Sequence, residues 1–175
     1  MPRFAIMLLS LSLAFAAPLS GHAQQGPGDE SVVSIADDDP AMVDAIETAR
    51  GHLGQVLTAA INEFGVAHPG LTLKVAFPVE SAQMDREVIW LSDISLAQDG
   101  MAGRLANDPV AMPGLKFGDE VRFTQDMIYD WGLAGPDDRI FGHFTTRVLL
   151  DQIPKAQADE IRTMLSDDPL PEAWR

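Results

Sequence analysis

The chain has 175 residues, of which 12 are Lys or Arg and 26 are Asp or Glu, so its formal net charge at pH 7 is −14. This acidic balance argues against nucleic acid or an anionic membrane as a partner, because both attract positively charged surfaces. Copies of the chain carry the same charge and should repel one another, so we expect a monomer. The sequence contains no cysteine, which excludes disulfides, thiolate metal sites and thiol nucleophiles.

Residues 1–23 have the layout of a secretory signal peptide. Arg3 supplies a positive charge, an apolar run covers residues 4–17, and Ala23 provides a small residue for a cleavage site. A membrane anchor is the weaker interpretation, because the run is shorter than the roughly 20 residues that a spanning helix needs. We therefore predict a periplasmic or secreted protein whose mature chain begins at Gln24 and keeps no membrane anchor.

Residues 24–38 form an acidic leader with little apolar content, and we expect it to be flexible. It runs into the acidic sequence Asp37-Asp38-Asp39. Calcium binding is the weaker interpretation of this run, because the spaced oxygens and distal glutamate of an EF-hand are missing. The preferred interpretation is that Asp39 caps a helix whose first turn holds Pro40.

Apolar residues then recur at steps of three and four over residues 40–64, which predicts a long helix with one apolar face. Gly65 follows as the residue that ends it. After residue 70 the apolar period changes to two, which predicts strands. The expected strands cover residues 71–79, 86–96, 101–107, 120–124 and 139–144, with a hairpin turn at residues 98–100.

Residues 126–131 fit either a short helical turn or an irregular strand. Further helices are expected to start at Thr145 and after Pro154. An acidic, proline-rich tail follows at residues 167–175, with Trp174 as a candidate packing anchor. The elements together predict one α+β domain over residues 39–166. In this domain a long N-terminal helix packs on a mainly antiparallel sheet of about five strands and short C-terminal helices follow.

Common catalytic motifs are absent from the sequence. It has no Gly-x-Ser-x-Gly elbow, His-Glu-x-x-His motif, phosphate-binding glycine loop or dinucleotide fingerprint. His52, His68 and His143 have no spacing that would place two of them on one metal ion. Asp126 and Asp130 would share a helical face, but in so acidic a chain a solvated face is preferred over a catalytic pair. We therefore predict no catalytic residue, no metal and no cofactor.

A group of aromatic and polar residues is the strongest candidate for a ligand or partner surface. Trp and Tyr offer broad rigid contact surfaces, and Arg offers a bidentate fork for a carboxylate. The structural alternative is that the tryptophans are core residues, the arginines pair with local aspartates and the asparagine holds a turn. The group consists of Trp90, Asp93, Arg104, Asn107, Tyr129, Asp130, Trp131, His143 and Arg147.

Ordered motifs along the chain carry a family resemblance. They are Val88-Ile89-Trp90 with Asp93, Leu105-Ala106-Asn107-Asp108-Pro109, Pro113-Gly114-Leu115-Lys116-x-Gly118-Asp119, Ile128-x-Asp130-Trp131 and Gly142-x-x-Thr145-x-Arg147. Taken in this order, they resemble the YegJ-like bacterial domain-of-unknown-function family. The resemblance implies a small α+β domain without an established activity, cofactor or catalytic residue. Relatives often carry paired glycines before an aromatic residue, whereas this chain has Gly142-His143-Phe144.

The sequence favours a non-catalytic periplasmic module that binds a protein partner or a small ligand through the region of Asn107 and Trp131. The alternative is a hydrolase that uses scattered carboxylates and His143, whose side-chain type has an ordinary pKa near neutrality. The binding module is preferred because the sequence offers no ordered nucleophile and base.

Overall fold

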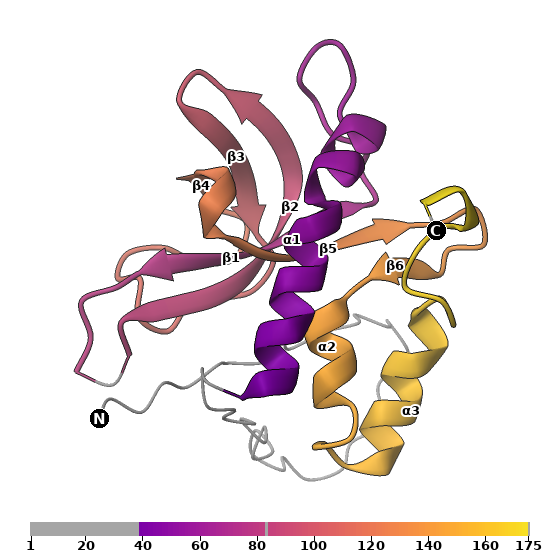
Figure 1. Cartoon of the computed structure of the whole chain (residues 1–175). Helices are drawn as coiled ribbons and strands as arrows, with labels where there is room; N and C mark the ends of the chain where they lie inside the picture. The colour runs from indigo at the N-terminus through magenta and orange to yellow at the C-terminus, as the bar shows by residue number, and fades with distance from the viewer. Residues whose placement is uncertain (1–38, 83, 175) are drawn as a thin grey trace, which may run out of the picture.

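The computed structural model describes residues 39–82 and 84–174, so the predicted signal peptide and leader lie outside the described residues. Within these residues the protein is α+β, with an antiparallel six-stranded sheet and three α-helices (Figure 1). None of the described helices combines the length and the apolar content needed to cross a membrane.

The sheet has the strand order β4-β3-β2-β1-β5-β6, and all neighbouring strands are antiparallel. The strands are β1 (Leu71–Pro78), β2 (Arg86–Ala97), β3 (Gly100–Leu105), β4 (Glu120–Phe123), β5 (Ile128–Ala134) and β6 (Ile140–Gly142). The sequence predicted about five strands, and the additional one is β5. It follows the short 3-10 helix η1 (Gln125–Met127), where the sequence fitted either a helical turn or a strand.

The sheet curls, because β4 and β5 are neighbours in the chain but lie four places apart in the strand order. In a flat sheet that separation would be about 19 Å. A link made of one 3-10 turn and two extended steps reaches only about 13 Å. The two strands can therefore be joined only if the sheet bends around its inner face, so that its first and fifth strands approach each other.

Helix α1 (Pro40–Ala60) lies against the inner face of the sheet (Figure 1). The Asp39 side chain accepts hydrogen bonds from the backbone N–H groups of Ala41 (2.9 Å) and Met42 (3.1 Å), which confirms the predicted cap. The helix ends at Ala60, four residues earlier than expected. Asn62 turns the chain there, since its side-chain oxygen accepts hydrogen bonds from the N–H groups of Phe64 and Val66.

One continuous core lies between α1 and the sheet. Trp131 is 0% exposed in it, and its indole N–H donates to the carbonyl oxygen of Ala49 at 3.0 Å, which ties β5 to α1. Burying so large an aromatic side chain with its polar atom satisfied stabilises the junction. The other buried members include Leu53, Val56, Leu71, Leu73, Val75, Ile89, Leu91, Ile94, Met101, Leu105, Val121, Phe123 and Ile128.

The loop between β3 and β4 is held down by one buried carboxylate. Glu87 on β2 is buried, and its two side-chain oxygens accept the backbone N–H groups of Val110 (2.6 Å) and Ala111 (2.7 Å). Met112 and Leu115 from the same loop pack against the core. The loop is therefore part of the folded unit.

Beyond the sheet come helices α2 (Phe144–Leu149) and α3 (Lys155–Met164), followed by the 3-10 turn η2 (Glu172–Trp174). The segment after α3 runs along β6. Leu165 forms a parallel bridge with Ile140, and the Gly142 N–H donates to the carbonyl oxygen of Pro169 at 2.7 Å. Trp174 meets Trp131 edge to face with ring centroids 6.1 Å apart, so the tail ends on the core.

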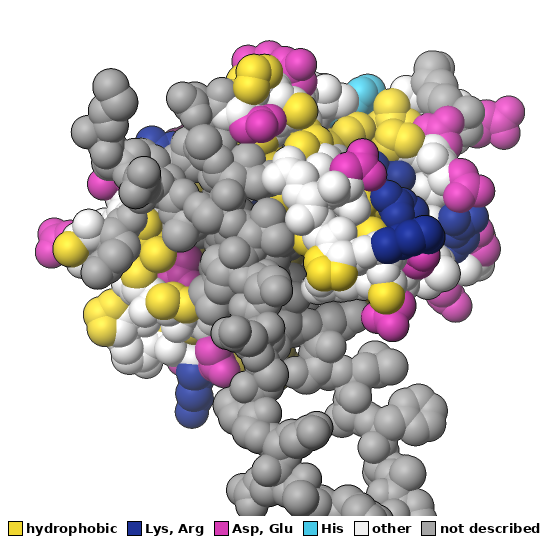
Figure 2. Space-filling model, turned by 90° about the horizontal axis from the view of Figure 1, so that it is seen from below, with side chains coloured by type: hydrophobic (Ala, Val, Ile, Leu, Met, Phe, Trp, Pro, Cys, Tyr) yellow, Lys and Arg dark blue, Asp and Glu magenta, His cyan; other side chains and the backbone are white. Residues whose placement is uncertain are grey.

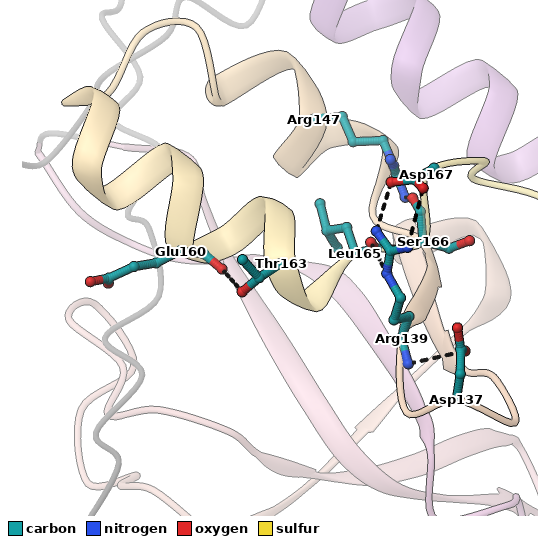
Figure 3. Close-up of polar contacts among 8 residues, drawn as sticks. All are labelled: Asp137, Arg139, Arg147, Glu160, Thr163, Leu165, Ser166 and Asp167. Atoms are coloured by element: carbon teal, nitrogen blue, oxygen red, sulfur yellow. Dashed lines mark hydrogen bonds and ion pairs between the residues drawn. The ribbon is translucent and has the colours of Figure 1, made fainter.

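Two arginines fasten this segment (Figure 3). The Arg139 guanidinium donates to the carbonyl oxygen of Leu165 and forms two hydrogen bonds with the carboxylate of Asp167, at 2.7 and 3.2 Å. Arg147 on α2 donates to the carbonyl oxygen of Ser166 at 2.8 Å. The predicted acidic tail is thus docked by cations that the preceding elements supply.

Candidate functional site

A buried polar centre, formed by Lys74, Asp130 and Thr145, joins β1, β5 and α2. The strand register places Lys74 opposite Asp130 on one side and Trp90 on the other. Lys74 is 3% exposed and Asp130 is 0% exposed. Buried charges of this kind are rare in proteins and require polar partners.

The Thr145 hydroxyl bridges the two charges. Lys74 Nζ donates to Thr145 Oγ1 at 3.0 Å, and the same hydroxyl donates to Asp130 Oδ2 at 2.6 Å. The carboxylate also accepts the backbone N–H groups of Trp131 (2.8 Å), Phe144 (3.2 Å) and Thr145 (2.8 Å). Asp130 thus acts as the acceptor in four hydrogen bonds, and two of them satisfy N–H groups at the start of α2.

Burial dominates the electrostatics of this centre. It lowers the pKa of Lys74 and raises the pKa of Asp130, and the attraction between the two opposes both shifts. Removing such a pair from water costs several kcal/mol unless the remaining polar atoms are bonded. Because these atoms are bonded to one another within the fold, the centre is suited to holding α2 against the sheet.

His143 and Trp90 extend the centre along the sheet. Their rings stack with centroids 4.3 Å apart and an interplanar angle of 20°. Lys74 Nζ lies over the Trp90 ring, 5.5 Å from its centroid, as a cation–π contact. His143 Nδ1 lies 3.2 Å from the Thr146 hydroxyl. On the other side of the ring, a Cβ atom at Gly132 would lie 2.5 Å from His143 Nε2, so only glycine leaves room for the imidazole.

Burial lowers the pKa of His143 to about 3, and the nearby cations Lys74 and Arg147 act in the same direction. The imidazole is therefore neutral at neutral pH. Its backbone has φ 53, and Gly142 before it has φ 78, so both residues occupy the left-handed region that glycine adopts most easily. His143 adopts this geometry with a side chain that packs on Trp90.

The structure therefore brings together Trp90, Asp130 and His143 from the predicted surface group, around Lys74. Asp93 and Arg104 form an exposed ion pair at 3.9 Å elsewhere on the sheet. Asn107 donates to the carbonyl oxygen of Asp108 at 3.2 Å, as a residue within a turn.

Other members of the group lie apart from this centre. Trp131 presents no surface to a partner, because it lies wholly inside the core, and this corrects its assignment to a contact surface. Arg147 donates to the backbone carbonyl oxygens of Gly142 and Ser166 instead of offering a free fork. Asp126 lies exposed in η1 while Asp130 lies buried in β5, so the two do not share a helical face.

Tyr129 lies between two arginines. Its hydroxyl is 2.6 Å from Arg86 Nη1, and the Arg50 guanidinium carbon lies 5.1 Å from the ring centroid. Arg50 also donates to the carbonyl oxygens of Asp126 and Ile128 and lines an open hollow of about 520 Å³. Within residues 39–82 and 84–174, no cluster of three His, Asp or Glu is placed to hold a metal ion.

Sequence reasoning missed Lys74 and Thr145. Lys74 occupies a polar position in an alternating strand, a pattern that predicts exposure to solvent. Its burial depends on the pairing of β1 with β5, which are more than 50 residues apart in the chain. No local signal in the sequence reports that pairing.

An exposed apolar patch, formed by Phe64, Val66 and Leu96, lies at the end of the sheet where β2 turns into β3. The three side chains are 81%, 51% and 56% exposed. The loop after α1 rests on the hairpin, because Val66 forms a bridge with Ser95 and the Leu96 N–H donates to the carbonyl oxygen of Gly65 at 2.7 Å. Such clustering marks interaction surfaces more often than isolated exposed apolar residues do.

The surroundings of the apolar patch are acidic. Glu63 and Asp99 flank it, and residues 61–70 and 95–101 contain no Lys or Arg. Figure 2 shows a different face, seen from below and away from this loop and hairpin, where acidic side chains lie around the margin and a cluster of Lys and Arg lies to one side. The patch therefore combines apolar contact area with negative charge.

The fold and these features define a small α+β module with a closed polar centre and an exposed apolar patch. Residues 39–165 match the family described as an uncharacterized protein conserved in bacteria, DUF2314, and the chain belongs to this family. It is similar to the uncharacterized protein YegJ of Escherichia coli (strain K12), with 28% identity over 159 residues, which covers 91% of this chain and 97% of that protein. No solved structure matches the chain.

Proposed function

We propose that this chain is a non-catalytic, exported module that binds a protein partner through the apolar patch of Phe64, Val66 and Leu96. The observation that carries the proposal is the gathering of three exposed apolar side chains from the loop after α1 and the end of β2. Export rests on the signal peptide that residues 1–23 predict. The patch replaces the region of Asn107 and Trp131 as the contact surface.

The partner should carry apolar side chains together with positive charge. Glu63 and Asp99 beside the patch, and the formal net charge of −14, would attract a basic segment and repel an acidic one. Complementary charge mainly raises the rate of association and the specificity, while the buried apolar contacts supply the affinity.

The two alternatives have less support. A small ligand would need a concave site with free polar groups, whereas Arg50 in the open hollow already donates to two backbone carbonyl oxygens. A hydrolase would need His143 as a base, but its lowered pKa makes it a weak one. Its Nε2 atom also faces the backbone of Gly132.

The test uses tagged full-length protein expressed with its own N-terminus and captured from a periplasmic fraction. Mass spectrometry of the mature chain should show Gln24 at its N-terminus. Captured proteins are then compared among wild type, Leu96→Asp and Val110→Asp, each shown to be folded by circular dichroism. Val110 is a matched control, since it is 59% exposed but lies in the loop between β3 and β4.

We expect a basic partner that is retained by wild type and Val110→Asp and lost with Leu96→Asp. The purified partner should bind wild type in calorimetry at least about tenfold more tightly than Leu96→Asp, the effect of losing roughly 1.4 kcal/mol. Equal binding to all three proteins would contradict the proposed patch. Substrate turnover that disappears in His143→Gln would support the hydrolase instead, and a full-length chain in the membrane fraction would contradict export.

A further inference from the structure

The two edges of the sheet differ. The outer side of β6 is occupied by the chain itself, because Leu165 pairs with Ile140 and the segment that follows is fastened by Arg139 and Arg147. β4 is the strand at the other edge, and within the described part of the chain it pairs with β3 alone. An edge strand with unpaired backbone groups is a template for another strand.

The backbone direction of β4 follows from its contacts with β3. The Leu105 N–H donates to the carbonyl oxygen of Asp119 at 3.0 Å, and a Cβ atom at Gly100 would lie 2.6 Å from the carbonyl oxygen of Phe123. Residues 119 and 123 therefore direct their backbone groups toward β3. Because direction alternates along an antiparallel strand, Glu120 and Arg122 direct their N–H and carbonyl groups outward.

The side chains of these two residues carry opposite charges. Glu120 and Arg122 are exposed on the outer face of the sheet, while Val121 and Phe123 face the core. Arg104 lies opposite Glu120 on β3, but its side chain forms its ion pair with Asp93 and donates to the carbonyl oxygen of Gly118. At the edge of the sheet, Glu120 and Arg122 therefore each combine a charged side chain with backbone N–H and carbonyl groups that point outward.

We propose that β4 pairs in antiparallel fashion with β4 of a second copy, centred on Val121. In this register Glu120 of each copy lies opposite Arg122 of the other, as a hydrogen-bonded pair. Both residues have the outward backbone groups that such a pair needs. The pairing forms two cross-strand ion pairs and satisfies the backbone of both edges. Across the sheet, the charges of Asp93, Arg104 and Glu120 alternate between negative and positive. Arg122 of the second copy would add the next positive charge in this row.

Two considerations limit the strength of this dimer. The strand has four residues, and the formal net charge of −14 on each copy opposes association, which is why the charge alone predicts a monomer. At physiological ionic strength charges farther apart than about 8 Å are largely screened, so the local pairs act against a weakened repulsion. We expect a reversible dimer that forms at high protein concentration. The apolar patch is a different surface, so the two proposals can fail independently.

The experiment is sedimentation equilibrium of the full mature protein at 0.15 M salt over a wide concentration range. Wild type is compared with Glu120→Arg, Arg122→Glu and the double variant that exchanges the two charges, each checked by circular dichroism. Each single variant places like charges opposite each other twice and should weaken the dimer at least about tenfold. The double variant restores opposite charges and should bring the dimerisation constant back to within about threefold of wild type.

The variants distinguish this register from general electrostatics. Glu120→Arg makes the net charge less negative, so an association limited only by repulsion would become stronger with it. A wild-type protein that stays monomeric throughout the concentration range, or a dimer insensitive to the single variants, would overturn the proposal. A double variant as weak as the single variants would overturn the register centred on Val121.

Discussion

At the scale of single residues, the fold is organised around the Thr145 hydroxyl. It receives a hydrogen bond from Lys74 and gives one to Asp130, so one small side chain satisfies two buried charges. A buried ion pair adds little net stability to the fold. Removing one partner is nevertheless strongly destabilising, because the remaining charge stays buried without compensation. The buried polar centre is therefore a point where conservative substitutions should have unequal effects.

Thr145→Val keeps the shape of the side chain and removes the hydroxyl, whereas Thr145→Ser keeps the hydroxyl and removes a methyl group. We expect Thr145→Val to lower the free energy of unfolding by about 1–3 kcal/mol, at the upper end because both hydrogen-bond partners are charged. Thr145→Ser should be clearly less destabilising. Urea unfolding followed by tryptophan fluorescence measures both, and equal losses would show that the hydroxyl does not bridge the charges.

His143 should make stability depend on pH. Its pKa is about 3 in the folded protein against an ordinary value of 6.5, so between these pH values the unfolded chain binds the proton and the folded chain does not. Stability from this group is complete above pH 6.5 and falls as the pH decreases toward 3. His143→Gln should flatten that part of the profile of unfolding free energy against pH. A ring signal of His143 that titrates between pH 6 and 7 in nuclear magnetic resonance spectra would contradict the burial.

At the scale of elements, local patterns predicted the parts of the fold that depend on neighbouring residues. Asp39 and Pro40 start α1 through a cap that needs only the next three residues. The end of α1 was placed too late, because Phe64 continues the apolar spacing although Asn62 turns the chain.

β5 was ambiguous for a different reason. A bulge pairs Val75 with Ile128 and Lys74 with Asp130, so Tyr129 is an extra residue and the alternation is broken. The candidate site was also predicted only in part. The sequence identified Trp90, Asp130 and His143, but Lys74 and Thr145 join them through contacts between residues far apart in the chain. The patch residues were also missed as a surface, because Phe64 and Leu96 read as members of a helix and a strand.

The C-terminal tail is the element whose contribution can be measured most directly. Trp174 packs edge to face on Trp131 and is partly buried, so Trp174→Ala should lower the free energy of unfolding by about 1–3 kcal/mol. Glu172→Ala lies in the same turn with an exposed side chain and should change it by less than about 0.5 kcal/mol. Denaturant unfolding of both variants decides whether the tail is docked in solution, and equal small effects would argue that it is not.

At the scale of the whole molecule, basic and acidic side chains have different roles. Several basic side chains form hydrogen bonds within the fold. Arg139 and Arg147 bind the C-terminal tail, and Lys74 binds Thr145 inside the protein. Much of the acidic excess remains on the surface. A protein built in this way gains solubility from its net charge.

The position of β1 between β2 and β5 also sets the order in which the fold can be completed during synthesis. β1 and β2 emerge early, but Lys74 has no carboxylate until residue 130 and no bridging hydroxyl until residue 145. A nascent chain that ends before these residues cannot close the sheet over Lys74 without burying an uncompensated charge. Stable folding therefore has to wait for the C-terminal third of the chain.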